Sequence, residues 1–287
     1  MSFYAGEFEN ARHYLERGIA LYDVQTHGRH GLRYIEDPGQ TCLSYLAQVV
    51  WMLGYPNQAV ERVKQAIGVA RATGHMPSVV EAVIWLAEIT VLRRDIPEAR
   101  ERVAAALALA TEHGLPTWIG MAKIMQGRVL NEQGQRVDGL AQIREGLSVA
   151  SRLYRPYSLS RLAEALAKAG ELDEALSALD EAMKCSRRFA VPYWDAELHR
   201  LEGELLVATG VDDRAEACFQ EAVAIAQTQG ARSLELRALT SLARVLAGRG
   251  ERQQAHDLLA PIYGWFSEGF ETADLKDAKV LLDELCW

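Results

Sequence analysis

The sequence has few cysteines and none of the patterns that a disulfide-bonded, zinc-binding or β-sheet protein requires. Its four cysteines, Cys42, Cys185, Cys218 and Cys286, include no C-x-x-C pair. This spacing argues against a disulfide framework or a zinc site and favours reduced thiols in a cytoplasmic protein. No run of strictly alternating apolar and polar residues is bounded by turn residues, so β-strands are not expected.

Basic charge and long hydrophobic runs are also scarce. The 39 acidic residues outnumber the 31 basic residues. A nucleic-acid surface usually has a basic excess, so we expect no nucleic-acid partner. The uncharged stretch 38–60 has an apolar centre at 42–55 that is too short to span a bilayer. Glu7 and Glu9 interrupt any basic-then-apolar signal pattern. These absences predict a cytoplasmic protein with no membrane partner.

Catalytic and metal-binding motifs are absent as well. The sequence contains no G-x-x-x-x-G-K-S/T, H-E-x-x-H or G-x-S-x-G pattern. Gly248 and Gly250 form part of a G-x-G, but no strand precedes them and no third glycine follows, which indicates an interhelix turn. His27 and His30 have no third ligand nearby in the sequence, so a solvated loop is the better interpretation. We therefore expect no enzyme activity, no cofactor and no metal.

The sequence does contain a repeat of about 40 residues. A first small series recurs in steps of 48, 40, 40, 36, 40 and 40, at Ala11, Ala59, Ala99, Gly139, Ala175, Ala215 and Ala255. Seven residues later comes a second small series, at Gly18, Ala66, Ala106, Gly146, Ala182, Ala222 and Ile262. Five residues before the first series comes a turn series, at Gly6, Gly54, Arg94, Gly134, Gly170, Gly210 and Gly250.

This spacing predicts a helix, a glycine turn and a second helix in each repeat. Small residues recur where two helix axes cross closely, because a larger side chain would push the helices apart. Glycine follows the first helix because that position often needs a left-handed backbone conformation. One such hairpin cannot bury its own apolar face, so several hairpins stack into an all-α solenoid.

We expect a single helical-repeat domain over 1–287. Only the tail of a first helix precedes the turn at Gly6, so 1–25 is interpreted as a half repeat. A repeat array normally begins with a polar cap, and a half repeat therefore indicates that the chain is a fragment or that its parent protein extends further N-terminally. Complete repeats are expected over 41–266.

Two irregular steps interrupt the period. The step of 48 places an insertion loop at 26–40, rich in glycine, proline and charge. This loop is either part of a binding face or a tolerated insertion. The step of 36 removes about one helical turn and predicts a tighter connection in the segment SRLYRPYSLS, at 151–160.

The array is expected to end in a capping helix at 272–286. Thr272 is the predicted N-cap, and Asp274 lies in the first turn, where the helix dipole favours negative charge. Five apolar residues share one face that would cover the last repeat: Leu275, Ala278, Leu281, Leu282 and Leu285.

The small series and the helix–glycine–helix order resemble the tetratricopeptide repeat, in a longer variety with a period near 40 rather than 34. This resemblance implies a right-handed α-solenoid. Four segments also resemble the C-terminal region of large bacterial proteins that combine a class III adenylate/guanylate cyclase domain, a nucleotide-binding ATPase module and a helical-repeat tail. They are DPGQTCLSYLAQVVWMLGYPNQA (37–59), AELHRLEGELLVATG (196–210), AEACFQEAVAIAQTQGARSLELRALTSLARVL (215–246) and LLAPIYGWFSEGFETADLKDAKVLLDEL (258–285). Neither the metal-binding aspartates of the cyclase nor a phosphate loop can be matched, so no catalytic activity is implied.

In this repeat class the first helices line a concave groove. Twelve residues have the helical positions that should point into it: Gln48, Trp51, Glu88, Arg128, Asn131, Tyr157, Glu164, Lys168, Glu197, Arg200, Glu204 and Arg244. Such a groove mixes both charges with aromatic residues, which suits an extended or helical peptide. The alternative is that many of these side chains are simply solvated. Trp118 and Trp194, near the starts of two first helices, are expected to pack between repeats.

Together these patterns predict a non-enzymatic scaffold that binds a protein, a peptide or another domain of its parent polypeptide. The resemblance implies that it is the regulatory repeat tail of a cyclase/ATPase-type bacterial signalling protein. The alternative is a small-molecule effector-sensing domain of a signalling or transcription-regulating protein. That alternative predicts a closed, mostly apolar pocket with a few polar groups.

Overall fold

Every regular element in the described part of the chain is helical, which confirms the all-α class. The computed structural model describes residues 2–28, 31 and 36–286, apart from the side chains of 212 and 213. The chain divides into two compact units, the first made of 1–3, 8–51 and 56–151, the second of 4–7, 52–55 and 152–287. The organisation as one domain and the handedness of the array stay predictions.

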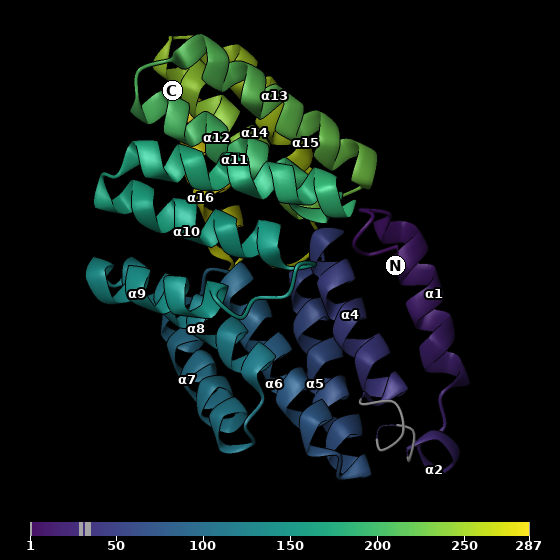
Figure 1. Cartoon of the computed structure of the whole chain (residues 1–287). Helices are drawn as coiled ribbons and strands as arrows, with labels where there is room; N and C mark the ends of the chain where they lie inside the picture. The colour runs from purple at the N-terminus through teal and green to yellow at the C-terminus, as the bar shows by residue number, and fades with distance from the viewer. Residues whose placement is uncertain (1, 29–30, 32–35, 287) are drawn as a thin grey trace. The chain divides into compact units, whose positions relative to one another are not determined.

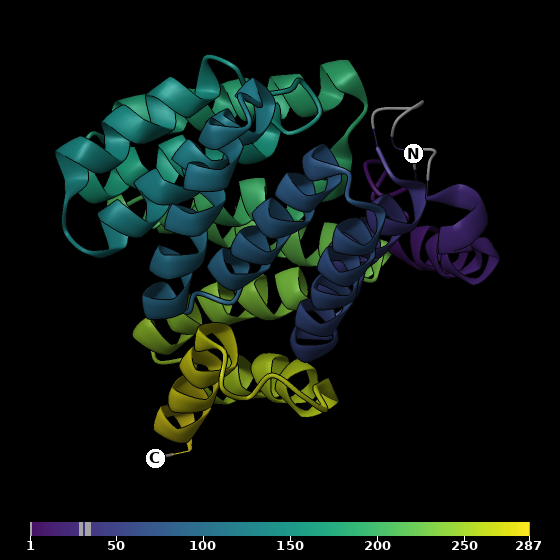
Figure 2. The same ribbon diagram turned by 90° about the horizontal axis from the view of Figure 1, so that it is seen from below.

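Each unit is a series of packed helices. The first contains α1 (Phe8–Leu21), α2 (Val24–His27), α4 (Pro38–Met52), α5 (Pro56–Thr73), α6 (Met76–Leu92), α7 (Ile96–Glu112), α8 (Pro116–Glu132) and α9 (Arg136–Leu147). The second contains α10 (Arg155–Ala169), α11 (Leu172–Phe189), the 3-10 helix η1 (Pro192–Trp194), α12 (Asp195–Ala208), α13 (Asp212–Gln229), α14 (Arg232–Gly248), α15 (Arg252–Trp265) and α16 (Ala273–Leu285). From α5 to α9 and from α10 to α16, each α-helix packs against the next α-helix (Figures 1 and 2).

The whole turn series has a left-handed backbone, as the sequence predicts. Its six glycines have φ between 74° and 94°, and Arg94 has φ 58°. A second set of left-handed residues follows the second helices, at Gly74, Gly114, Ala190 and Gly230. A residue with a side chain is strained in this conformation, whereas glycine adopts it freely. Arg94 and Ala190 therefore have strained backbones that the rest of the fold must stabilise.

The first small series is buried throughout. The closest helix crossing described is between α8 and α9, where both helices contribute glycine. A Cβ atom on Gly127 would lie 2.4 Å from the carbonyl oxygen of Gly139. A Cβ atom on Gly146 would lie equally close to the carbonyl oxygen of Gly120. Only glycine allows these backbones to approach so closely.

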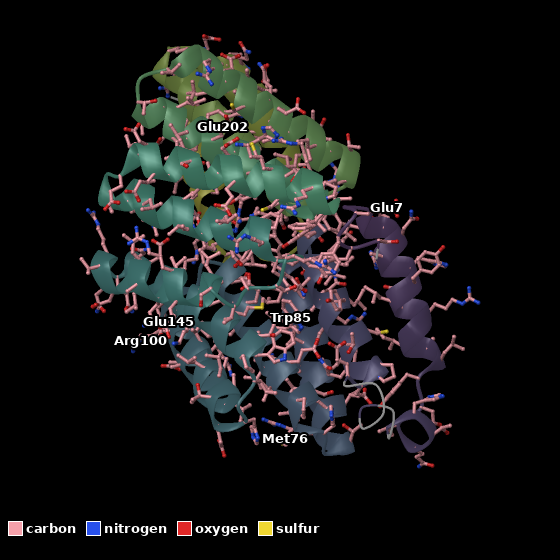
Figure 3. All side chains as sticks on the ribbon, viewed as in Figure 1. Glu7, Met76, Trp85, Arg100, Glu145 and Glu202 are labelled. Carbon is pink, nitrogen blue, oxygen red and sulfur yellow. The ribbon has the colours of Figure 1, made fainter. Side chains whose placement is uncertain are left out.

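Tryptophan side chains pack between neighbouring repeats, as predicted. In the first unit Trp85 lies among side chains of adjacent helices (Figure 3), and its ring meets the edge of Trp118 with centroids 5.8 Å apart. In the second unit Trp194 is fully buried, and its ring centroid lies 5.1 Å from that of Tyr157 on α10.

The predicted insertion loop at 26–40 is helical at both edges. Asp23 caps α2 by accepting hydrogen bonds from the N–H groups of Gln25 and Thr26. Asp37 accepts from the N–H of Gln40 and so caps α4, with Pro38 as its first residue. Residues 29–30 and 32–35 of the predicted loop lie outside the described residues.

The prediction of a tighter connection at 151–160 is wrong. The four residues that the step of 36 lacks are missing from a helix and not from the connection. Helix α9 has 12 residues, whereas α7 has 17 and α11 has 18. The connection from Leu147 to Arg155 is instead longer than those after α5, α7 and α13. The division between the two units falls within this connection, between Ser151 and Arg152.

The C-terminal helix has the predicted buried face. All five apolar residues of that face are buried against residues of α14 and α15. Thr272 occupies the N-cap position, but its hydroxyl donates to the carbonyl oxygen of Gly269 at 2.7 Å and does not cap the helix. The side-chain cap predicted from the sequence is therefore wrong.

None of the described helices combines the length and the apolar character that crossing a bilayer requires. Over the same residues the cysteines are free thiols. No three histidine, cysteine, aspartate or glutamate side chains of the described chain are grouped so that they could hold a metal ion.

Candidate functional site

The first unit buries all five of its predicted groove residues. Gln48 and Trp51 lie on α4, Glu88 on α6, and Arg128 and Asn131 on α8. Each of them is buried. Among the described residues, Nε2 of Gln48 and Oδ1 of Asn131 have no hydrogen-bond partner. These side chains are therefore packed within the unit rather than solvated.

The same unit contains a buried carboxyl group, that of Glu81 on α6. Oε1 of Glu81 accepts a hydrogen bond from Nε1 of Trp85 at 3.3 Å. Burial raises the pKa of Glu81 to about 8, and the charge of Glu36 adds to this, although hydrogen bonds from Trp85 and Gln40 act in the opposite direction. Glu81 is consequently a neutral acid at pH 7.

The residues His75, Ser78 and Asp37 also meet in this unit, but they do not form a catalytic triad. Nδ1 of His75 lies 2.9 Å from Oγ of Ser78, which accepts from the backbone N–H of Asp37 at 3.1 Å. The carboxylate of Asp37 accepts from the hydroxyl of Tyr22 and the N–H of Gln40. A triad needs that carboxylate on the histidine, so this set has a structural role at the starts of α4 and α6.

The second unit brings three predicted residues of α12 into one ion network. Oε1 and Oε2 of Glu197 accept from NH2 and Nε of Arg200, at 3.0 and 2.9 Å. Arg200 also donates through NH1 to Oε1 of Glu204. The hydroxyl of Ser241, on α14, donates to the same Oε1 atom at 2.9 Å. The side chain of Glu204 remains 45% exposed, so it is the solvent-facing end of the network.

Arg237 and Asp274 extend the network onto α14 and α16. Nε of Arg237 donates to Oδ2 of Asp274 at 2.7 Å, and its NH1 lies 3.5 Å from Oε1 of Glu197. Burial by itself raises the pKa of Glu197, but the charges of Arg200 and Arg237 and the hydrogen bonds from Arg200 outweigh it and lower the pKa to about 2. Glu197 is thus ionised although it is fully buried.

A third buried arginine, Arg161, continues the network onto α10. The side chain of Arg161 is 0% exposed, and NH1 donates to Oε2 of Glu164. The Arg161 guanidinium lies over the rings of Tyr157 and Trp194, at 4.7 and 5.1 Å from their centroids. The charge of Glu164 also raises the pKa of Arg200. The two helices therefore share one electrostatic environment.

We call this set the charged face. Its members are Arg161, Glu164, Glu197, Arg200, Glu204, Arg237, Ser241 and Asp274. It contains three guanidinium groups and four carboxylates, and therefore one negative charge in excess. Ordered ion pairs of this kind can bind and orient a charged ligand.

The remaining predicted residues of this unit are placed less uniformly. Tyr157 contributes its ring to the charged face through Arg161. Lys168, on α10, and Arg244, on α14, are exposed.

Sequence reasoning missed Arg161, Arg237, Ser241 and Asp274. Arg237 lies 40 residues after Glu197, at the same repeat position, and Arg161 shares a helical stripe with Tyr157 and Glu164. The repeat therefore contained a signal for both arginines. Asp274 lies in the last helix, outside the period, and no column of the repeat points to it.

Two family models match parts of the chain. Residues 154–228 match the model of the tetratricopeptide repeat, and residues 3–92 match the model of anaphase-promoting complex subunit 5. An uncharacterized protein of Rhizobium meliloti (strain 1021) is 25% identical over 248 residues, which are 84% of this chain and 24% of that protein. The chain therefore spans about a quarter of the length of that relative.

Two solved structures with this fold are Rap proteins. One, complexed with competence and sporulation factor, is 14% identical, with a TM-score of 0.56 over 85% of this chain and 74% of that chain. The other, the Rap conjugation gene regulator of the plasmid pLS20 in complex with a Phr peptide, is 12% identical. Its TM-score is 0.59 over 86% of this chain and 63% of that chain. With the helical pairs described above, these similarities establish tetratricopeptide-like repeats.

Proposed function

We propose that this chain is a non-enzymatic repeat scaffold that binds a peptide, or an extended segment of a protein, through the charged face. The observation that carries the proposal is the anchored carboxylate of Glu204. Arg200 and Ser241 hold its Oε1 atom, while the side chain is 45% exposed. A carboxylate held in place can bind a cation with little further loss of side-chain freedom. The proposed ligand therefore presents a lysine or arginine to Glu204.

Equivalent positions of the first unit support a binding role for these charges. Ile84 and Ile124 occupy the repeat position of Arg200, and Met125 occupies that of Arg161. All three apolar residues are buried, so this fold can pack the position without charge. Replacing a buried ion network by apolar side chains is often neutral or stabilising. Stability alone is therefore a weak explanation of the charged face, and recognition of a ligand is a better one.

The relatives support a peptide as the ligand. Both Rap proteins were solved with a bound factor, namely competence and sporulation factor in one and a Phr peptide in the other. Their identity to this chain is low, so the shared feature is the fold. Tetratricopeptide-like helix pairs suit the recognition of extended or helical segments, because side chains of successive first helices present a repeating surface.

A displayed library of linear 12-residue peptides, selected on the full chain, tests this function. We expect the recovered peptides to share a basic residue and to bind about tenfold more weakly to Glu204→Gln. Glu221→Gln is the matched control, because Glu221 is an exposed glutamate of α13 outside the charged face. Unchanged affinity at Glu204→Gln would contradict the proposal. The proposal would also be contradicted if the chain bound no peptide while a metabolite raised its thermal midpoint. That result would favour effector sensing.

We also propose that the chain works as the repeat tail of a cyclase/ATPase-type bacterial signalling protein. The support is the resemblance of four segments to such tails and a Rhizobium relative of which the match covers only 24%. Binding at the charged face would then bias the parent between two states, as a coupling free energy. The coding sequence upstream of Met1 tests this. A cyclase domain or a phosphate loop in the same reading frame would support the proposal, and the absence of both would contradict it.

A further inference from the structure

The second unit contains a surface cavity that the charged face does not use. The cavity has a volume of about 270 Å³ and lies among α13, α14 and α15, which pack side by side (Figure 1). Its floor is apolar, with Val223, Leu239, Leu258, Ile262 and the ring of Trp265. Four polar residues also line it, and two of them, Arg232 and Glu235, form an ion pair.

The polar side of the cavity leaves part of one guanidinium group available. NH1 of Arg232 donates to Oε2 of Glu235 at 2.6 Å, and Gln227 donates to Oε1 of the same carboxylate. The carboxylate is thereby satisfied on both oxygens. The described residues provide no acceptor for Nε or NH2 of Arg232, whose side chain is 36% exposed and lies 5.4 Å from the ring centroid of Trp265. These atoms can donate to a ligand in the cavity.

The helix that forms the opposite wall supplies an acceptor. Pro261 lies inside α15 and lines the cavity. Asp257 also lines the cavity. The apolar floor is thus flanked by donor atoms of Arg232 on one helix and by Asp257, whose carboxylate accepts a hydrogen bond from Gln253, on another.

Size and chemistry together define the ligand. Pockets that enclose a small molecule usually have roughly 300–1,000 Å³, so this cavity suits one large apolar side chain better than a whole effector. A peptide unit carries an acceptor and a donor on either side of its side chain, which complements Arg232 and Asp257. A single buried anchor of this kind can supply much of the affinity of a peptide.

The cavity lies on a different face of α14 from the ion network. Successive helical residues are rotated by about 100°, so Glu235 and Arg237 are about 200° apart around the axis. Leu239 and Ser241 are related in the same way. A ligand in the cavity therefore does not need the charged face, and each surface can be removed without changing the other.

We propose that this cavity is a second peptide-binding site, which takes one large apolar anchor residue of a partner segment. The anchor side chain packs on Val223, Leu239 and Ile262, and the neighbouring peptide groups bond to Arg232 and Asp257. The surface is separate from the charged face, and its test is designed so that either proposal can fail alone.

The test selects the 12-residue peptide library on the Glu204→Gln chain, which removes the anchored carboxylate of the charged face. We expect recovered peptides to share one leucine, phenylalanine or tryptophan. Their affinity should fall at least tenfold when Val223→Trp fills the cavity, and about threefold to tenfold in Arg232→Gln. Val207→Trp and Arg214→Gln are the matched controls, since both are exposed residues outside the cavity.

Circular dichroism and the thermal midpoint establish that each variant is folded. Because Val223→Trp and Arg232→Gln alter different walls, one folded variant is enough to decide. If no peptide is recovered, or if the recovered peptides bind both variants as tightly as the parent, the proposal is wrong. N-acetyl-phenylalanine methylamide serves as the small probe. If it binds as tightly as the peptides, the cavity is a small-molecule site, which would also overturn the proposal.

Discussion

Glu81 and Glu197 occupy the same position of the repeat, one in each unit, but at pH 7 Glu81 is neutral and Glu197 is ionised. Both are buried on a first helix. Burial and the charge of Glu36 raise the pKa of Glu81 to about 8. The Arg200 and Arg237 charges outweigh burial at Glu197 and lower its pKa to about 2. One glutamate is a neutral hydrogen-bonding group, and the other is the centre of an ion network.

The difference shows that a repeat position does not determine the chemistry of its side chain. The helix supplies only the direction in which the side chain points, and the neighbouring helices determine whether it is charged. In the first unit the neighbouring groups are Glu36, which has a like charge, and Trp85 and Gln40, which only form hydrogen bonds; no cation is among them. The same fold can therefore support an apolar interior with a few neutral polar groups, or a charged surface suited to recognition.

Replacing the charged member of the pair should have the largest effect. Glu197→Gln leaves Arg200 and Arg237 buried without their shared carboxylate charge, and breaking a buried ion pair in this way typically destabilises by about 3–5 kcal/mol. Glu81→Gln changes no charge of the folded chain at pH 6, and it removes the proton uptake that folding of the parent requires there, so we expect a loss of less than about 1 kcal/mol at pH 6. Urea unfolding of both variants at pH 6 checks this, and similar losses for the two would break the comparison.

The second-largest effect compares how closely the paired helix backbones approach each other in the first unit and in the second. Gly146 and Ala182 hold equivalent positions in the second small series. A Cβ atom on Gly146 would lie 2.4 Å from the carbonyl oxygen of Gly120, so Gly146→Ala should destabilise by about 2–3 kcal/mol through overpacking. Ala182 is buried with its methyl group accommodated.

The reverse change, Ala182→Gly, is the matched control for Gly146→Ala. It removes one buried methyl group and should destabilise by only about 1 kcal/mol, through helix propensity. Thermal unfolding measures both variants. If Gly146→Ala were tolerated as well as Ala182→Gly, the two helix pairs would not differ in how closely they approach.

The sequence was sufficient to predict the backbone of the repeats. The turn series predicts a left-handed residue at each turn, and this holds even at Arg94, where glycine is missing. It could not predict where four deleted residues would be lost. The structure loses them from α9, which ends at Leu147, directly after Gly146, and is followed by a longer connection to α10.

The candidate site was less predictable for a physical reason. Helical periodicity identified Glu197, Arg200 and Glu204, because all three lie on one stripe of α12. The charge state of Glu197 also depends on partners 36 or more residues away, such as Arg237 and Arg161. No rule of spacing assigns such pairs. For the same reason Gln48 and Glu88 have the predicted positions and yet are buried.

The third effect uses the pH dependence of stability to separate the two glutamates. The folded chain keeps the proton of Glu81 up to about pH 8, whereas the unfolded chain releases it near 4.5. The stabilisation from Glu81 is therefore complete below pH 4.5 and is lost as the pH rises toward 8. From pH 5 to pH 7 the free energy of unfolding should fall by about 2 kcal/mol relative to Glu81→Gln.

Glu197 should act with the opposite sign. Its folded pKa of about 2 lies below the ordinary value of 4.5, so its stabilisation is present above pH 4.5 and is lost as the pH falls toward 2. Urea unfolding of the parent and of Glu81→Gln, measured between pH 5 and pH 8, isolates the Glu81 contribution. A constant difference between the two chains over this range would mean that Glu81 is ionised in the folded state.

The smallest effect moves the comparison from charges to backbone strain. Ala190, between the first and second repeats of the second unit, has φ 52° and is exposed. The left-handed conformation costs an alanine about 1–2 kcal/mol, and glycine gives back part of this through a more flexible unfolded chain. Ala190→Gly should therefore stabilise the chain by about 0.5 kcal/mol.

Gly170→Ala is the reverse control. A Cβ atom at this position meets nothing within 4 Å, so only the backbone strain of φ 87° opposes the substitution. Thermal unfolding should shift in opposite directions for the two variants, and equal shifts would show that the turns of this unit are not under backbone strain.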